Sequence, residues 1–224
     1  MEKFKEILRK YGIEEDKISM MAEYAVFLLE ENEKYNLTRI IEPEDMALRH
    51  FIDSISACGF IPKGAKVIDV GTGGGFPGIP IKIMRPDIDL VLADSSHKKI
   101  DFVRAGASRL GLPVSAVAKR AEEMKEWRGT FDIVVSRAVA ALNILCELCV
   151  PLLKTGGTLL AYKGADAGEE IERARHALIV LNCSLSVHDA GMQGREHKIL
   201  EIKKQEPTPE QYPRRFSRIK KSPL

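Results

Sequence analysis

The sequence has no apolar run that approaches the roughly 18–20 residues of a membrane-spanning helix. Its first residues, MEKFKEILRKYG, are amphipathic and of mixed charge. They lack the apolar stretch and the small-residue cleavage site of a signal peptide. These absences predict a cytoplasmic protein with no membrane partner.

Cysteine is also scarce. The chain contains Cys58, Cys146, Cys149 and Cys183, and their spacing fits no disulfide framework. Cys146 and Cys149 form a C-x-x-C pair, but the pair lies within a repeat of leucines at helical spacing. We therefore interpret both as small buried hydrophobic residues rather than as a redox or metal pair, and we predict no metal cofactor.

Aromatic residues make up only 6% of the chain, which argues against an extended platform for stacking the bases of a single strand. The net charge is only +2, but charge is unevenly distributed. The N-terminal third is acidic, whereas residues 212–224 contain five cations and no acid. A basic end on a neutral body predicts a polyanionic partner. A solvated tail is the alternative interpretation.

The order of the predicted elements indicates an α/β fold. About sixty residues of helical pattern come first, and from Lys66 onward apolar strands alternate with helices. Such alternation predicts a mostly parallel sheet with helices on both faces. Two last strands without a helix between them predict an antiparallel addition at the C-terminal edge. The predicted strands are Val67–Val70, Leu90–Ala93, Val114–Ala118, Phe131–Val135, Thr158–Tyr162, Ser184–Val187 and Lys198–Lys203, and the helices between them are Ile79–Met84, His97–Leu110, Asn143–Leu153 and Glu169–Leu181.

Residues 66–80, KVIDVGTGGGFPGIP, have the layout of a loop that binds a nucleotide cofactor. A short apolar strand ends in a cluster of glycines, and a helical pattern begins after them. Glycine permits positive φ in the tight turn and a close approach of the backbone to a ligand. The following helix supplies unpaired N–H groups and the positive end of its dipole.

Two cofactors fit this loop. Residues 73–78 match G-x-G-x-x-G, the pattern of a dinucleotide site, although Pro77 supplies no N–H to a pyrophosphate. The alternative spacing is Asp69-x-Gly71-x-Gly73-x-Gly75, with an acidic residue at the end of the strand. A carboxylate there repels a pyrophosphate but suits the ammonium and sulfonium groups of S-adenosylmethionine (SAM). We therefore favour SAM over NAD.

Later strand ends supply further candidates, because ligands of open α/β sheets lie outside the carboxyl ends of the strands. Asp94 ends the second strand at the distance expected for a carboxylate that binds ribose, although it could instead cap the next helix. Ala121 and Glu122 follow the third strand, where their backbone could meet the adenine edge and the Glu122 carboxylate could order the loop.

Arg137 ends the fourth strand, where a guanidinium group is costly unless it is paired. One interpretation is a contact with the carboxylate of the cofactor or with a phosphate, both of which accept two hydrogen bonds from arginine. The alternative is a buried ion pair with Asp69, Asp94 or Asp132.

These residues resemble the motifs of the bacterial 16S rRNA guanine-N7 methyltransferases, a family also called glucose-inhibited division protein B. The resemblance covers nearly the whole chain, and its most specific parts are the strings GGFPGIP and RHFIDS. It extends to Asn36-Leu37-Thr38, Arg120-Ala121-Glu122, Ser136-Arg137-Ala138, Lys163-Gly164 and Tyr212-Pro213-Arg214.

The resemblance implies a SAM-dependent methyltransferase fold of the Rossmann-like class with added N-terminal helices. It also implies methyl transfer to N7 of one guanine in 16S rRNA, with naked rRNA, the small ribosomal subunit or an assembly intermediate as the partner. The family's cofactor contacts carry over to Gly71, Phe76, Ala121, Glu122 and Arg137. With the candidates described above, the predicted SAM-binding residues are Asp69, Gly71, Gly73, Gly75, Phe76, Asp94, Ala121, Glu122 and Arg137.

Guanine N7 has an in-plane lone pair and carries no proton, so direct in-line transfer needs no general base. We expect catalysis by positioning and electrostatics, and we assign no catalytic residue. Contact with RNA needs cations elsewhere, and each one taken singly could be an ordinary solvated side chain. The candidates are Arg49, His50, Lys163, Arg195, Lys198, Arg214, Arg215 and Arg218.

Two other functions stay open on these residues. One is methylation of a small molecule by SAM, and the other is a non-catalytic RNA-binding assembly factor that has kept the loop as structure. In each case we expect a monomer with three parts: a helical extension over residues 1–60, a methyltransferase domain over residues 61–211 and a basic tail over residues 212–224.

Overall fold

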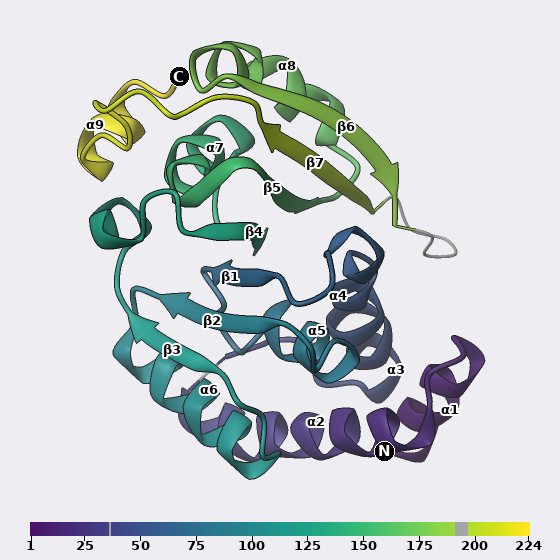
Figure 1. Cartoon of the computed structure of the whole chain (residues 1–224). Helices are drawn as coiled ribbons and strands as arrows, with labels where there is room; N and C mark the ends of the chain where they lie inside the picture. Colours follow the sequence, from purple (N-terminus) through teal and green to yellow (C-terminus); the bar gives the residue numbers. More distant parts are fainter. Residues whose placement is uncertain (36, 191–196) are drawn as a thin grey trace.

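One sheet organises the chain. The computed structural model describes residues 1–35, 37–190 and 197–224. The strands in these ranges are β1 (Lys66–Val70), β2 (Asp89–Asp94), β3 (Ser115–Ala118), β4 (Phe131–Arg137), β5 (Leu153–Lys163), β6 (Cys183–Asp189) and β7 (Lys198–Lys204). Their order is β3-β2-β1-β4-β5-β7-β6 (Figure 1). The pairs among β1 to β5 are parallel, whereas β7 is antiparallel to both β5 and β6, which confirms the predicted sheet.

Helices precede and separate the strands, as predicted. They are α1 (Glu2–Lys10), α2 (Glu15–Tyr35), α3 (Pro43–Met46), α4 (Asp53–Ile55), α5 (Gly78–Met84), α6 (His97–Arg109), α7 (Leu142–Cys149), α8 (Ala167–Val180) and α9 (Phe216–Lys221). A π-helical turn, Ala47–Ile52, joins α3 to α4. Within the described ranges, no helix is both long and apolar enough to cross a membrane.

The segment after α7 differs from the predicted helix Asn143–Leu153. The α-helix ends at Cys149, a 3-10 turn covers Val150–Leu152, and β5 begins at Leu153. Pro151 explains the difference, because a proline has no N–H to continue the helical hydrogen bonds and restricts the residue before it.

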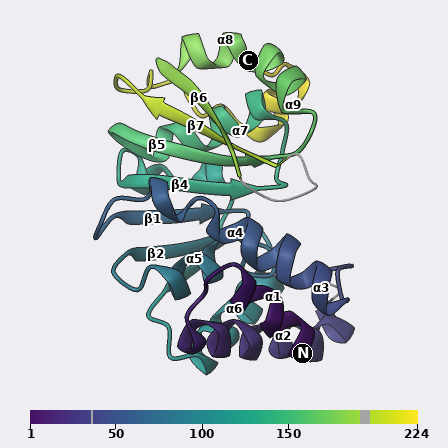
Figure 2. The same cartoon turned by 90° about the vertical axis from the view of Figure 1, so that its right-hand side faces the viewer.

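Each face of the sheet has its own core, since successive side chains of a strand point to opposite faces. Along β2, Leu90 and Leu92 pack into the core beneath α1–α6, whereas Val91 and Ala93 pack into the core beneath α7–α9. Figures 1 and 2 show α2 and α6 on one side of the sheet and α7 and α8 on the other. The glycine loop, which follows β1, therefore begins from a strand with a hydrophobic core on each of its faces.

The N-terminal helices share the first core. Phe4 and Tyr24 are fully buried in the same cluster as residues of β1 and β2. Phe27 on α2 stacks on Phe102 of α6, with 4.9 Å between ring centroids and 12° between the ring planes. The residues of α1 and α2 thus belong to the same core as residues of α5 and α6.

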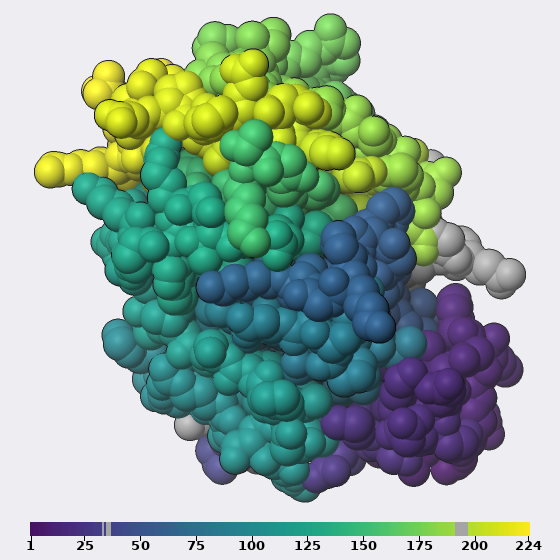
Figure 3. Space-filling model, viewed as in Figure 1, coloured from purple at the N-terminus to yellow at the C-terminus, as the bar shows by residue number. Residues whose placement is uncertain are grey.

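The C-terminal segment is docked on the fold, which contradicts the alternative of a solvated tail. Ile219 of α9 is fully buried in the second core. Figure 3 shows the segment spread over the middle part of the chain, away from the N-terminal helices. The exposed cations of this segment therefore have defined positions.

Close packing of α2 on α6 can be tested at Gly106. A Cβ there would come within 2.6 Å of Tyr24 Cε2 and 2.9 Å of Phe27 Cε1. We expect Gly106→Ala to lower the free energy of unfolding by about 1–3 kcal/mol through overpacking. Alanine is the better helix former, so Gly168→Ala in α8, where nothing lies within 4 Å of the added Cβ, should be neutral or stabilising by up to about 1 kcal/mol. Denaturant unfolding measures both variants, and equal effects would contradict the packing argument.

Candidate active site

The glycine loop is held from below by Asp69. This residue lies in β1, its side chain is fully buried, and its Oδ2 accepts the N–H of Gly78 at 2.9 Å. The N–H of the last glycine in the G-x-G-x-x-G match is therefore already used within the protein. This geometry weakens the dinucleotide interpretation. The Asp69 carboxylate lies beneath the loop and lines none of the three cavities described below, and its contact with SAM stays a prediction.

Phe76 supports the loop from the side of the N-terminal helices. Its ring is stacked on His50, with 4.5 Å between centroids, and meets Phe51 and Tyr24 edge-on. The Tyr24 hydroxyl donates to the carbonyl oxygen of Gly74 at 3.0 Å. A cofactor contact was predicted for Phe76, but the structure encloses its ring in an aromatic cluster.

The loop glycines have different roles. Gly71, Gly73 and Gly75 all have positive φ, of 78°, 57° and 88°. A Cβ on Gly75 would collide with the Tyr24 hydroxyl, and the N–H of Gly73 donates to Asp94 Oδ2 at 3.1 Å. Of the three, only Gly71 lines the cavity of about 300 Å³ that is described next. Gly73 and Gly75 therefore shape the turn.

A cavity of about 300 Å³ lies at the carboxyl ends of β1, β2 and β3, which is within the size range of small-molecule sites. Of the predicted SAM-binding residues, it is lined by Gly71, Asp94, Ala121 and Glu122. Ala121 and Glu122 begin a 3-10 turn, Ala121–Glu123, so their N–H groups lack partners within that turn. A cavity of about 490 Å³ lies on the other side of these two residues, but neither Gly71 nor Asp94 lines it.

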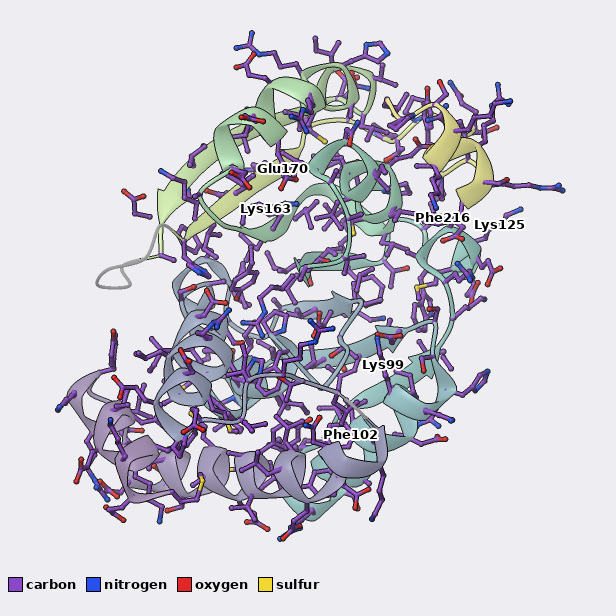
Figure 4. The ribbon with its side chains drawn as sticks, turned by 180° about the vertical axis from the view of Figure 1, so that it is seen from behind. Lys99, Phe102, Lys125, Lys163, Glu170 and Phe216 are labelled. Carbon is purple, nitrogen blue, oxygen red and sulfur yellow. The ribbon has the colours of Figure 1, made fainter. Side chains whose placement is uncertain are left out.

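Asp94 connects the loop to the start of α6. Besides the Gly73 N–H, its carboxylate accepts the N–H of Ser96 at 2.9 Å, and Lys99 Nζ lies 3.5 Å away (Figure 4). Each carboxylate oxygen retains a further lone pair for a ligand hydroxyl. The cavity thus offers apolar walls, free backbone N–H groups and an acceptor for two neighbouring hydroxyls, which fits the nucleoside part of SAM.

A larger cleft of about 810 Å³ adjoins this cavity. Ala138 and Val139 line both spaces, directly after the end of β4. Ala138 has φ of 57°, a conformation that is costly for an L-residue, and the side chain of Val139 lies over Gly71. The other polar residues of the cleft include Arg49, His50, Asp53, Arg137, Lys163, Glu170, Arg173 and His197.

Asp53 is a site residue that the sequence interpretation missed. Its buried carboxylate lies 2.5 Å from Arg137 Nη1 and 2.9 Å from His197 Nδ1. Arg137 Nη1 also donates to the carbonyl oxygen of Arg49 at 3.0 Å. The alternative interpretation of Arg137 was an ion pair with Asp69, Asp94 or Asp132. Arg137 is indeed paired, but with Asp53, which directly follows the π-helical turn. The RHFIDS string was the only signal for it.

His50 and Lys163 do not supply free positive charge to the cleft. Burial, together with the guanidinium groups of Arg137 and Arg49, lowers the pKa of His50 to about 4, so the ring is neutral near pH 7. Lys163 Nζ donates to Glu170 at 2.6 Å and to the carbonyl oxygen of Ala140 at 2.9 Å (Figure 4). Arg49 is exposed and has no ion pair among the described residues.

The candidates for RNA contact near the C-terminus are also partly paired and partly exposed. Arg214 pairs with the fully buried Glu147, at 2.7 Å from Nε and 2.5 Å from Nη2. Arg215 and Arg218 are exposed, and Lys198 lies 3.4 Å from Asp189. Arg195 lies outside the described residues.

No group of three or more metal-binding side chains occurs in the ranges that the structure describes.

Solved methyltransferases share this fold. A SAM-dependent methyltransferase from Aquifex aeolicus has a TM-score of 0.57 at 14% identity, over 75% of this chain and 97% of that one. TYW2 of M. jannaschii, solved in complex with AdoMet, has a TM-score of 0.55 at 13% identity, over 67% and 73% of the two chains. The chain therefore has the fold of the SAM-dependent methyltransferases.

The family follows from the sequence comparisons. Residues 17–199 match the GidB family, described as rRNA small subunit methyltransferase G. The Ribosomal RNA small subunit methyltransferase G of Desulfitobacterium hafniense (strain Y51) is 42% identical over 216 residues, which cover 93% of this chain and 90% of the relative. The chain belongs to this methyltransferase family, and the resemblance found in the motifs is confirmed.

The burial of Asp69 makes folding stability depend on pH. Burial raises the pKa of Asp69 from 3.8 to about 7, so the native state favours the protonated carboxyl group. Its stabilising contribution is complete below the unfolded pKa and is lost as pH rises through about 7. We expect the stability of the cofactor-free protein to fall relative to Asp69→Asn between about pH 4 and about pH 7, and the difference to level off above that range. Urea midpoints measured across this range for both proteins test the expectation, and a constant difference would contradict it.

Arg214 and Arg215 form a matched pair of neighbouring arginines. Arg214→Ala would leave the Glu147 carboxylate buried without its partner, so we expect the free energy of unfolding to fall by about 3 kcal/mol. Arg215→Ala removes an exposed side chain and should change it by less than about 0.5 kcal/mol. Equal stability of the two variants in denaturant unfolding would show that the Arg214–Glu147 pair does not anchor the tail.

Proposed function

We propose that this chain transfers the methyl group of SAM to N7 of a guanine in 16S rRNA. Membership of the rRNA small subunit methyltransferase G family supports the reaction and the substrate class. The observation that carries the proposal is the meeting of two spaces at Ala138 and Val139, a nucleoside-sized cavity on one side and a wide polar cleft on the other. A cofactor and a base that enter from opposite sides would meet there.

The cavity assigns roles to its residues in this proposal. Asp94 would accept the ribose hydroxyls, and the N–H groups of Ala121 and Glu122 would face the adenine edge. Gly71 would allow the backbone to approach the ligand closely. Asp69, Gly73, Gly75 and Phe76 would act indirectly, because they hold the loop in shape.

Bound SAM supplies a methyl group activated by the sulfonium charge. The N7 atom of guanine has no proton to lose, so the cleft residues need to hold the base and not to deprotonate it. Arg137 keeps donors beyond the one that binds Asp53, and these would hold a phosphate or the cofactor carboxylate. Asp53 would position both Arg137 and His197, because its carboxylate lies between them.

RNA phosphates would contact cations outside the paired interior of the cleft. Arg49 at the cleft and Arg215, Arg218, Lys220 and Lys221 on the C-terminal segment are exposed. Within the described residues none of these five has an ion pair. The proposed partner is 16S rRNA, alone or in the small subunit or an assembly intermediate, which places the protein in the cytoplasm, and we propose that it acts as a monomer.

The function is tested by transfer of a labelled methyl group from SAM. We expect label in 16S rRNA or in partly assembled small subunits, at a single guanine found by strand cleavage at N7-methylguanosine. Transcripts made with 7-deazaguanosine keep their base pairing but lack the N7 atom, so they should take up no label. Label in the 7-deaza transcript would show that another atom is methylated.

The labelling experiment, together with binding measurements, separates the two other functions. A folded protein that binds S-adenosylhomocysteine but labels no RNA would favour a small-molecule substrate. Failure to bind S-adenosylhomocysteine in calorimetry would favour a non-catalytic RNA-binding protein. A steep fall of RNA affinity with salt would support phosphate contacts.

A further inference from the structure

The C-terminal segment carries an aromatic residue, Phe216, at the first position of α9. Its ring is half-buried and lines the cavity of about 300 Å³ together with Ala121 and Glu122. The Arg120 guanidinium carbon lies 6.0 Å from the centre of this ring. Thus a segment predicted only to bind RNA forms one wall of the cofactor site.

Three contacts keep this wall in place. Glu147 binds both the backbone N–H of Arg214, at 3.0 Å, and its guanidinium group. Arg128 donates to the carbonyl oxygen of Pro209 at 3.1 Å and to those of Thr208 and Tyr212. Ile219, one turn after Phe216, is fully buried. The position of the Phe216 ring is therefore fixed from both sides along the chain.

The ring lies close to the residues proposed to meet the adenine. Its neighbour Arg120 directly precedes Ala121 and Glu122, the residues whose N–H groups face the adenine edge in the proposed cofactor arrangement. Val139, whose side chain lies over Gly71, lines both this cavity and the cleft, so the methyl group would lie near it in the proposed arrangement. An aromatic face beside Ala121 and Glu122 suits a flat heterocycle, because offset stacking is favourable.

We propose that Phe216 binds the adenine of SAM by stacking on it, so that the C-terminal helix is part of the cofactor site. This inference rests on the proposed cofactor arrangement and adds a residue to it. Calorimetric titration with S-adenosylhomocysteine tests it. Loss of a base–aromatic stack should weaken binding roughly tenfold in Phe216→Ala. Phe216→Leu keeps apolar volume but removes the ring, so roughly fivefold weaker binding is expected, whereas Phe216→Tyr should stay within about twofold.

Controls separate stacking from docking of the tail. Tyr11→Ala removes an exposed aromatic ring far from the cavity and should leave the affinity unchanged. Trypsin sensitivity at Arg215 and Arg218 reports whether α9 stays docked in each variant. Wild-type affinity in Phe216→Ala or Phe216→Leu would overturn the proposal. Equal losses in Ala, Leu and Tyr variants, accompanied by cleavage of the tail, would overturn it too, because that pattern belongs to lost docking.

Different results would contradict the proposed function and the stacking of Phe216. Wild-type protein that binds no S-adenosylhomocysteine would refute the cofactor arrangement as a whole. Wild-type protein that binds it and methylates RNA, with affinity insensitive to Phe216, would refute only the stacking.

Discussion

The shape of the loop after β1 depends on hydrogen bonds made from beneath it. Asp69 binds the Gly78 N–H, Tyr24 binds the Gly74 carbonyl oxygen, and Asp94 binds the Gly73 N–H. The first two partners come from different layers, a strand and the long N-terminal helix. The long helix α2 therefore contacts the loop directly, although it does not line the neighbouring cavity of about 300 Å³.

Several cations of the candidate site and of the C-terminal segment form ion pairs within the protein. Arg137, a candidate for cofactor contact, and Lys163 and Arg214, candidates for RNA contact, are each paired with a carboxylate. Pairing avoids the cost of burying an isolated charge. The cleft wall is consequently close to electrical balance, whereas Arg215 and Arg218 of the C-terminal segment are exposed.

Much of the site could be predicted because the topology of an open α/β sheet brings the carboxyl ends of its strands together. This rule selected Gly71, Asp94, Ala121 and Glu122, which all line one cavity. It could not show that Phe76 faces an aromatic cluster, since a loop residue has no periodicity that reveals its direction. Nor could it find Asp53 with His197, which are 144 residues apart, or Phe216 at the cavity.

The order of strands and helices, the position of the glycine turn and the uneven charge were determined by the sequence alone, because apolar periodicity and backbone freedom are local properties. Which side chains face a ligand was decided only by the tertiary structure. The direction of Asp69, the partner of Arg137 and the docking of Phe216 depend on which distant surfaces meet. These long-range contacts form because α2 is buried against one face of the sheet and the C-terminal segment against the other.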